Sequence, residues 1–396
     1  MKVAFVVPRY GAEVRGGAET GARMLAEHLV ADRGAAVEVF TTCARDALTW
    51  DNELAEGTVT ERGVVVHRVA SAAGRQTSFH PLSALLLADP ARVPEDQARQ
   101  WLDWQGPLAP ALVDAVAASD ADVIAFYPYL YYPTVRGLPR VRDRAIMHPA
   151  AHEEPALHLP IFRHLFEMCR GFVFHSASER RLVESLFGVA TTPQVTIGLG
   201  VDEVDGDAAA AAPFLDEKSP YLVCIGRVDD KKGTGVLWRY FETYKARHRA
   251  PLKLVLVGQV VDAPAPSDHL VVTGVVDDAT KWALLRGARA LVAPSPVESF
   301  SLQVIEAMTA GTPVLVNATC GPTREHCERS GAGLWFGGFA EFDAALERLV
   351  TDDALHAAMA GNGRGYVDAN YRWPVVLDRY CNFLEAWGPR QGKGVP

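Results

Sequence analysis

Two glutamates flank a short polar segment in PVESFSLQVIEAMTAGTPVL (296–315). Glu298 precedes the segment, and Glu306 lies in the helix that the following apolar residues predict. At 1.5 Å per residue, the two carboxylates are on the order of 10 Å apart along the helix axis. Carboxylates accept hydrogen bonds from vicinal hydroxyls, so the pair suits a diphosphate with a ribose at one end and a hexose at the other. For an isolated pair, a helix-end charge and a surface glutamate would be the simpler interpretation.

The segment between the two glutamates predicts an anion site. The apolar strand ARALVAPS ends near Ser295, and the helix begins between Ser299 and Leu302. The backbone amides of Phe300, Ser301 and Leu302 are then free donors at the positive end of a helix.

A second candidate anion site is GRVDDKKG (226–233), which follows another predicted strand. Arg227 offers a planar fork and Lys232 a point charge, and both lie between the strand end and the next helix. Two cations can converge on one phosphate at such a position. A solvated charged turn is the alternative, and we prefer it for Lys231.

The turn PRYGAEVRGGAET (8–20) follows the first predicted strand. Gly16 and Gly17 would let the backbone approach a ligand at the start of a helix. The gap from Gly11 to Gly16 fits a P-loop, but the Lys-Ser/Thr that must follow is missing, and there is no dinucleotide fingerprint. Taken alone, this segment fits a plain tight turn equally well.

Three histidines and two glutamates follow a strand in MHPAAHEEPALH (147–158). The spacing of His148, His152 and Glu153 could suggest a metal site, but the proline and the lack of helical context argue against one. We expect no bound metal. His158 and His175 are expected to be structural.

Elements that place these motifs at strand ends can be recognised along the chain. Short β-branched runs predict strands buried on both faces, and amphipathic segments between them predict helices, so the pattern is βαβ with parallel sheets. The predicted strands are 3–8, 37–43, 64–70, 122–130, 145–150, 171–177 and 195–200, then 221–228, 252–260, 269–276, 288–295 and 313–319.

The two series of strands predict two domains. The acidic, alanine-rich segment 201–220 has no strand period and is expected to be a linker. We predict two doubly wound α/β domains facing across a cleft, 1–200 and 201–372, with a final helix (373–388) that crosses back to the first. Ligands in such sheets bind beyond the carboxyl ends of the strands.

Composition excludes several classes of protein. With 396 residues, 49% hydrophobic and 22% charged, the chain is globular and large enough for two domains. A net charge of −9 argues against a nucleic-acid partner. The six cysteines form no CxxC pair and are expected to be buried free thiols. With no signal peptide or membrane span, we expect a cytoplasmic protein with at most peripheral contact with the inner membrane face.

Together the three strand-end motifs resemble the retaining glycosyltransferases of family 4, which have the GT-B fold. Glu298, Glu306 and the EAMTAGTPV tail are similar to that family's paired-glutamate motif. Its Gly-Arg-x4-Lys-Gly signature matches 226–233, and its Gly-Gly-x-Glu turn matches 16–19. A later Gly-Gly-x-x-Glu motif reads CGPTREH here, with Pro322 in place of the second Gly and Glu325 as the candidate Glu.

The resemblance implies a role for each matching residue. Arg227 and Lys232 would bind the donor diphosphate. Glu306 would bind the ribose hydroxyls, and Glu298 those of the transferred sugar. His152, with His148 as the alternative, would face that sugar. The other donor-binding positions are the amides of Phe300, Ser301 and Leu302, Gly16 and Gly17 on the other domain, and Val275 and Val276 in the loop that reads the nucleobase.

The expected reaction is transfer of a hexose-type sugar from a nucleotide diphosphate sugar to an acceptor hydroxyl, with no further cofactor. The acceptor is a glycan, a glycolipid or a small molecule, and cell-surface polysaccharide assembly is the favoured context. The alternatives are a natural-product glycosyltransferase, a sugar phosphorylase or synthase of the same fold, and a non-enzymatic nucleotide-sugar binding protein. The segments 78–107 and 127–133 are the expected acceptor contacts.

Overall fold

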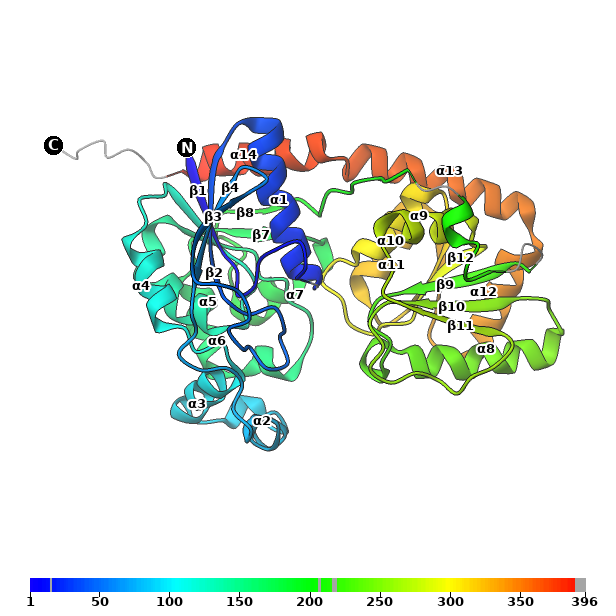
Figure 1. Ribbon diagram of the computed structural model, residues 1–396, viewed down its shortest axis with the longest axis horizontal. Coiled ribbons are helices and arrows are strands. Elements are labelled where there is room, and N and C mark those ends of the chain that lie inside the picture. The colour runs from blue at the N-terminus through cyan, green and yellow to red at the C-terminus, as the bar shows by residue number, and fades with distance from the viewer. Residues whose placement is uncertain (15, 206–207, 216–218, 389–396) are drawn as a thin grey trace. The chain divides into compact units, whose positions relative to one another are not determined.

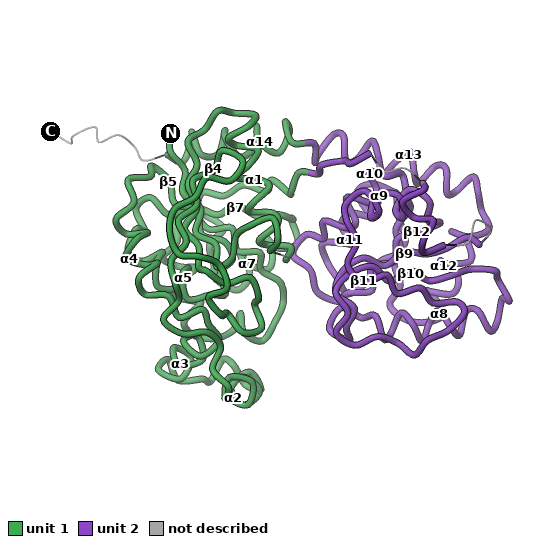
Figure 2. Tube along the Cα trace, in the orientation of Figure 1, with its two compact units in different colours: residues 1–200, 373–396 green, residues 201–372 purple. Residues whose placement is uncertain are grey.

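In a computed structural model, the described residues are 1–14, 16–205, 208–215 and 219–388. The chain divides into two compact units, Met1–Gly200 with Trp373–Pro396, and Val201–Arg372 (Figure 2). Residues 206–207 and 216–218 of the predicted linker lie outside the described residues.

The first unit contains an eight-stranded sheet that is parallel apart from β3 (Figure 1). In spatial order its strands are β3 (Gly57–Glu61), β4 (Val64–Val69), β2 (Ala36–Thr42), β1 (Lys2–Val6), β5 (Val123–Phe126), β6 (Ala145–Met147), β7 (Phe172–Phe174) and β8 (Gln194–Thr196). Its helices are α1 (Gly17–Arg33), α2 (Phe79–Leu86), α3 (Glu95–Gln105), α4 (Pro110–Ala118), α5 (Tyr132–Gly137), α6 (Pro160–Met168), α7 (Ala177–Phe187) and α14 (Trp373–Trp387), with 3-10 turns η1 (Pro90–Arg92), η2 (Leu138–Arg140), η3 (Arg142–Arg144) and η4 (Pro155–His158).

Apolar side chains on both faces of β1 explain why this sheet is covered twice. Ala4 and Val6 belong to the core that includes residues of α3, α4 and α6. Val3 and Phe5 belong to the opposite core, which includes residues of α1 and α14. Because successive strand residues point to opposite faces, a continuous apolar strand needs such a layer on each side.

The last helix, α14, belongs to the first unit although it follows the second unit in sequence. Its buried residues are Trp373, Val376, Leu377, Tyr380, Phe383 and Leu384. The Trp373 ring stacks on His28 of α1 with a centroid distance of 4.0 Å, and Tyr380 lies against Phe5 of β1.

The second unit has a six-stranded parallel sheet. Its strands, in spatial order, are β11 (Leu270–Gly274), β10 (Lys253–Val257), β9 (Tyr221–Ile225), β12 (Ala290–Ala293), β13 (Val314–Asn317) and β14 (Gly333–Phe336). Its helices are α8 (Thr234–His248), α9 (Asp278–Gly287), α10 (Leu302–Ala310), α11 (Gly321–Ser330), α12 (Phe339–Thr351) and α13 (Asp353–Asn370), with η5 (Ala208–Ala211) and η6 (Asp230–Lys232). One core joins the sheet to α8 and α12, including Leu237, Phe241, Phe342 and Leu346.

Two strands were not predicted, and most of the others were predicted too long, such as 122–130, where β5 ends at Phe126, and 145–150, where β6 ends at Met147. β3 is an exposed edge strand, paired antiparallel with β4 through a turn in which Arg62 and Gly63 have φ of 47° and 83°. β14 is a four-residue edge strand. The run 195–200 is a strand only as far as Thr196. The predicted free thiols are confirmed, since all six cysteines are free and only Cys381 is not fully buried.

Candidate functional site

The topology of the second sheet brings two of the predicted motifs together. From β9 the chain proceeds through β10 to β11 on one side, and from β12 through β13 to β14 on the other. The carboxyl ends of β9 and β12, which are neighbours, therefore form the topological switch point at which such sheets bind ligands. The segments 226–233 and 294–301 begin at these two strand ends.

A cation and a carboxylate from the two segments meet directly. Lys232 Nζ lies 2.7 Å from Glu298 Oε1, and the side chains are 36% and 17% exposed. Gly233 at the end of η6 has φ 79°, and a Cβ there would lie 2.6 Å from the Pro294 carbonyl oxygen. Close approach of the two loops thus requires glycine at this position.

Asp229 organises the segment that carries both predicted cations. One of its carboxylate oxygens accepts a hydrogen bond from the Lys232 amide at 2.8 Å, which caps η6. The other is paired with Nε of Arg227. Asp229 thus holds the segment at both predicted cations, at the backbone of Lys232 and at the side chain of Arg227.

Helix α10 begins at Leu302, as predicted, without a side-chain cap. Ser301 at the N-cap has φ 77°, a left-handed conformation that is unusual for serine. Its hydroxyl is buried and has no hydrogen-bond partner among the described residues. The first turn of α10 thus combines free amides with a strained residue, a combination that is common at ligand sites.

A buried polar chain holds the loop before α10. Nε2 of His326 donates to the Phe300 carbonyl at 3.1 Å, and Nδ1 of His326 lies 3.1 Å from the Tyr366 hydroxyl. That hydroxyl lies 3.0 Å from the hydroxyl of Tyr371. Burial lowers the pKa of His326 to about 4, so the imidazole is neutral and can keep both hydrogen bonds.

Glu306 lies in the interior of the unit and is paired. Its Oε1 is 2.8 Å from Nζ of Lys281 on α9, which also lies 3.0 Å from Asp278. Burial raises the pKa of Glu306, and the Lys281 ammonium opposes this rise. The interpretation of Glu306 as an ordinary surface residue is therefore wrong.

Val275 and Val276 lie in the loop between β11 and α9. Gly274 before them has φ 69°, and the side chain of Asp277 after them caps α9 by accepting from the Thr280 amide at 2.7 Å. Val275 is 43% exposed. The loop is therefore fixed at both ends and presents an apolar side chain to solvent.

The remaining predicted positions belong to the first unit. Gly17 is the first residue of α1, and Gly16 is its N-cap. A Cβ on Gly16 would collide with the Glu19 carboxylate, which accepts from Nε of Arg9 at 3.0 Å, whereas a Cβ on Gly17 would meet nothing within 4 Å. The backbone at Gly17 is therefore open to close approach by a ligand.

The two candidate histidines lie in different surroundings. His148 is fully buried, 3.3 Å from the Tyr380 hydroxyl, and burial holds its pKa well below the usual range. His152 lies on the loop after β6 with a side chain that is 32% exposed, 3.8 Å from Glu154. Glu153 instead pairs with His158 at 2.6 Å. Of the two histidines, only His152 has a side chain that a ligand could reach.

Comparison with known proteins gives a family match within the second unit. Residues 207–366 match the family described as Glycosyl transferases group 1. This match covers most of the second unit, which is called the group 1 domain below. The D-inositol 3-phosphate glycosyltransferase of Salinispora arenicola is 27% identical over 201 residues, 45% of this chain and 45% of that protein. The lipopolysaccharide core biosynthesis mannosyltransferase LpcC of Rhizobium leguminosarum bv. viciae is 28% identical over 305 residues, 65% of this chain and 83% of that protein.

Solved structures establish the fold of the whole chain. The sucrose-phosphate synthase of Thermosynechococcus elongatus superposes with a TM-score of 0.71 at 18% identity, covering 98% of this chain and 99% of that one. The chain has the GT-B fold, and the resemblance expected from the sequence is confirmed at the level of a GT-B glycosyltransferase. The chain spans about half the length of several curated relatives that it matches.

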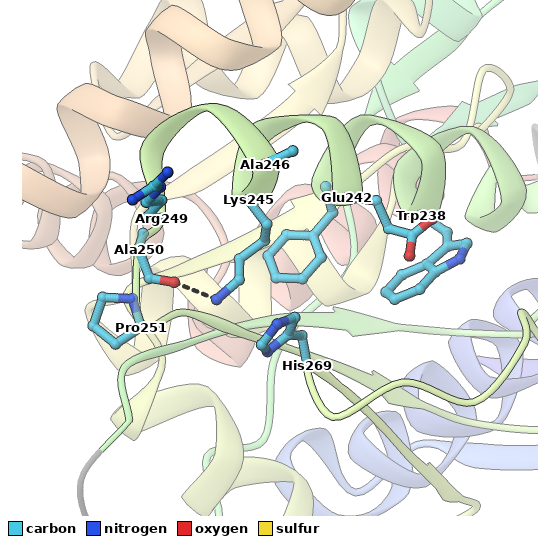
Figure 3. A pocket seen from close by; sticks show the side chains of 9 residues that line it. Trp238, Glu242, Lys245, Ala246, Arg249, Ala250, Pro251 and His269 are labelled. Atoms are coloured by element: carbon cyan, nitrogen blue, oxygen red, sulfur yellow. Dashed lines mark hydrogen bonds between the residues drawn. The ribbon is translucent and has the colours of Figure 1, made fainter.

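One pocket of the group 1 domain, with a volume of about 540 Å³, is separate from these residues (Figure 3). It lies between one face of α8, the loop 249–251 and His269. Because that loop leads into β10 and His269 precedes β11, the pocket is at the amino ends of the strands. Its Lys245 donates to the carbonyls of Ala250 and Leu252, so this cation is committed to the backbone.

Three residues of the group 1 domain site were not found from the sequence: Asp229, Lys281 and His326. Asp229 carried a local signal, since an acidic residue directly before a short helical turn is a typical N-cap. Lys281 and His326 carried none, because their partners lie 25 and 26 residues away in sequence. In the described parts of the chain, no helix is long and apolar enough to cross a membrane.

Proposed function

We propose that the protein transfers a hexose-type sugar from a nucleotide diphosphate sugar to an acceptor hydroxyl with retention of anomeric configuration. The observation that carries the proposal is the arrangement at the switch point of the group 1 domain. Lys232 with Glu298, and Lys281 with Glu306, form two ion pairs around the segment that ends in the uncapped first turn of α10. The Lys232–Glu298 pair suits the sugar and phosphate, and the Lys281–Glu306 pair suits the ribose.

In this proposal the protein acts mainly by electrostatics. Arg227, Lys232 and the first amides of α10 stabilise the negative charge that grows on the leaving diphosphate. Lys232 must leave Glu298 to reach the phosphates, which frees the Glu298 carboxylate for the sugar hydroxyls. The acceptor attacks from the face of the leaving group, with a phosphate oxygen as base. No protein nucleophile and no metal ion are required, and His152 is assigned to the transferred sugar.

The identities of donor and acceptor are proposed from the relatives. Several relatives are named as mannosyltransferases that act in lipopolysaccharide core biosynthesis or on phosphatidylinositol mannosides, and one name includes GDP-mannose. One structural neighbour was solved with UDP and glucose. We therefore propose a GDP- or UDP-hexose donor and a cell-surface glycan or glycolipid acceptor, with the enzyme acting in the cytoplasm. The first unit would bind the acceptor and the second the donor.

Donor turnover tests the proposal. The full-length chain is incubated with GDP-mannose, UDP-glucose and other nucleotide sugars, and release of the nucleoside diphosphate is followed with and without candidate acceptors. We expect turnover with one donor, and a loss of kcat/KM of about 100-fold in R227A and E298A, because each removes charge-assisted contacts in the transition state. Unchanged turnover in either variant would refute the assignment. Product analysis separates transfer to a glycan from synthesis of a sugar phosphate.

A further inference from the structure

The pair between Lys281 and Glu306 is unusual because both charges are largely removed from water. The side chains are 21% and 11% exposed. Lys281 lies in the first turn of α9, where the cap by Asp277 fixes its position, and Glu306 lies in the second turn of α10. Two separate helices thus have to pack in one register for the ammonium to reach the carboxylate.

Burial makes this carboxylate dependent on its cation. Desolvation penalises the charged form of a carboxyl group, and a nearby opposite charge restores it. Two charged groups act on Glu306 in the described parts of the chain: Lys281, which lowers its pKa, and Asp278, which raises it. Asp278 is itself on α9, 72% exposed and 3.0 Å from Lys281. Lys281 is therefore the group that opposes neutralisation of Glu306.

The contact also orients the carboxylate. Lys281 occupies Oε1 of Glu306, so Oε2 and the second lone pair of Oε1 remain available to a ligand. A carboxylate accepts hydrogen bonds from two hydroxyls, whereas a protonated carboxyl group uses one oxygen as a donor and no longer matches a diol.

We propose that Lys281 is a positioning residue that keeps the Glu306 carboxylate ionised and oriented for the ribose hydroxyls of the donor. This inference rests on the proposed function, in which Glu306 holds the ribose. Lys281 acts through Glu306 and touches no reacting atom. Its loss weakens binding of ribonucleotides in particular, and more strongly at lower pH, where an unpaired Glu306 becomes protonated.

The experiment measures Kd by calorimetry for UDP and GDP, each beside its 2′,3′-dideoxy form, between pH 6.0 and 8.5. The full-length wild type is compared with K281M, K281R and E306Q, and with K231M, which removes an equal charge from an exposed position of the same unit. Taking the ratio of variant to wild type at each pH cancels ionisation of the nucleotide phosphates. Circular dichroism and a thermal melt establish that each variant is folded.

For K281M we expect a Kd ratio for the ribonucleotide of about 3 at pH 8.5, rising by about tenfold toward pH 6.0. The ratio for the dideoxynucleotide should stay near 1 throughout. K281R should restore most of the affinity, and K281M should have no further effect in an E306Q background. K231M should change both nucleotides equally, without dependence on the sugar.

Three results overturn the inference. If K281M weakens the ribo and dideoxy forms equally, Lys281 does not act through the ribose. If the ratio is independent of pH, Lys281 does not control the ionisation of Glu306. If K281M is unfolded, the K281R and E306Q variants test the inference instead. Equal ribonucleotide affinity in wild type and E306Q would show that Glu306 does not bind the ribose, so Lys281 could not act through it. If neither nucleotide binds the wild type, the proposed function itself fails.

Discussion

The imidazole of His326 shows how a single buried residue can support the site. It donates to the carbonyl of Phe300, the residue that precedes the Ser301 cap of α10. Its pKa is about 4, below the value near 6.5 of an unfolded histidine, and burial is the main cause. Between these values the unfolded chain binds the extra proton, so stability is fully present above pH 6.5 and is lost as pH falls toward 4.

We therefore predict that H326Q, which keeps a donor but cannot be protonated, differs from wild type in its response to pH. At pH 7.5 H326Q should be less stable by about 1–3 kcal/mol, because a buried hydrogen-bond network is disturbed. By pH 5.5 this difference should shrink by about 1 kcal/mol. Native-state hydrogen exchange of the α10 amides, corrected for intrinsic rates, measures both values.

Other buried groups also make stability depend on pH in this range. The difference in stability between wild type and H326Q removes their contribution, because both proteins contain them. Glu179, with a pKa raised to about 8 by burial, contributes stability that is present below pH 4.5 and lost as pH rises through 8. It lies in the first unit and is common to both proteins, so it cancels in the difference. Parallel pH curves for wild type and H326Q would show that folding does not lower the pKa of His326.

At the scale of residues, the sequence predicted what short-range spacing determines. Arg227 and Lys232 follow one strand within a few positions, and their segment could be recognised without knowledge of the fold. The contacts of Lys281 with Glu306 and of His326 with Phe300 depend on how α9 and α11 are rotated about their axes relative to α10. That rotation is set by packing of whole helices, which no local pattern encodes.

At the scale of elements, substitutions at Gly200 and in α14 can test whether the two are in close contact. A Cβ on Gly200 would collide with the indole ring of Trp373, which is 6% exposed. We predict that G200A destabilises the first unit by about 1–3 kcal/mol through overpacking. W373A should cost about 3–5 kcal/mol through the cavity that it leaves. Urea unfolding, followed with a probe in the first unit, measures both changes.

The double variant is the decisive arm of this test. Once Trp373 is removed, the added methyl group has space, so G200A should cost much less in a W373A background than in the wild type. G361A, in α13 of the second unit, adds a Cβ that would meet nothing within 4 Å and should leave the unfolding of the first unit unchanged. Additive effects of G200A and W373A would show that the two residues are not in contact.

Strands and helices were predictable in proportion to how strongly they are buried. β12 is apolar throughout, β1 is apolar after Lys2, and both were found, whereas β3 (GTVTE) is exposed at nearly every position and lacks that signal. Helix α14 was predicted from its one-sided apolar pattern. The edge strand β3 forms because β4 offers a free edge and the turn at Arg62 and Gly63 returns the chain to it, a tertiary cause.

At the scale of the whole molecule, one of the two units consists of two segments that are far apart in the sequence. The second unit is a continuous segment, 201–372, with its own sheet and core. The first is discontinuous, and α14 contributes six buried side chains to it, including Tyr380 and Leu384. At about 1.5–3 kcal/mol for each large apolar side chain, α14 supplies stabilisation on the order of 10 kcal/mol, comparable to the net stability of a domain.

We therefore predict opposite behaviour for two fragments. The segment 201–372 should fold alone, whereas 1–200 should not, because removing α14 exposes a large part of the core that α14 shares with α1 and the sheet. Adding the peptide 373–388 in trans should restore the fold of 1–200, and the peptide with Tyr380→Ala and Leu384→Ala should not. Dispersion of amide signals in NMR spectra and resistance to proteolysis report folding. If the 1–200 fragment folds without the peptide, α14 is dispensable for that core. The packing of α14 on the first unit would then serve function rather than stability.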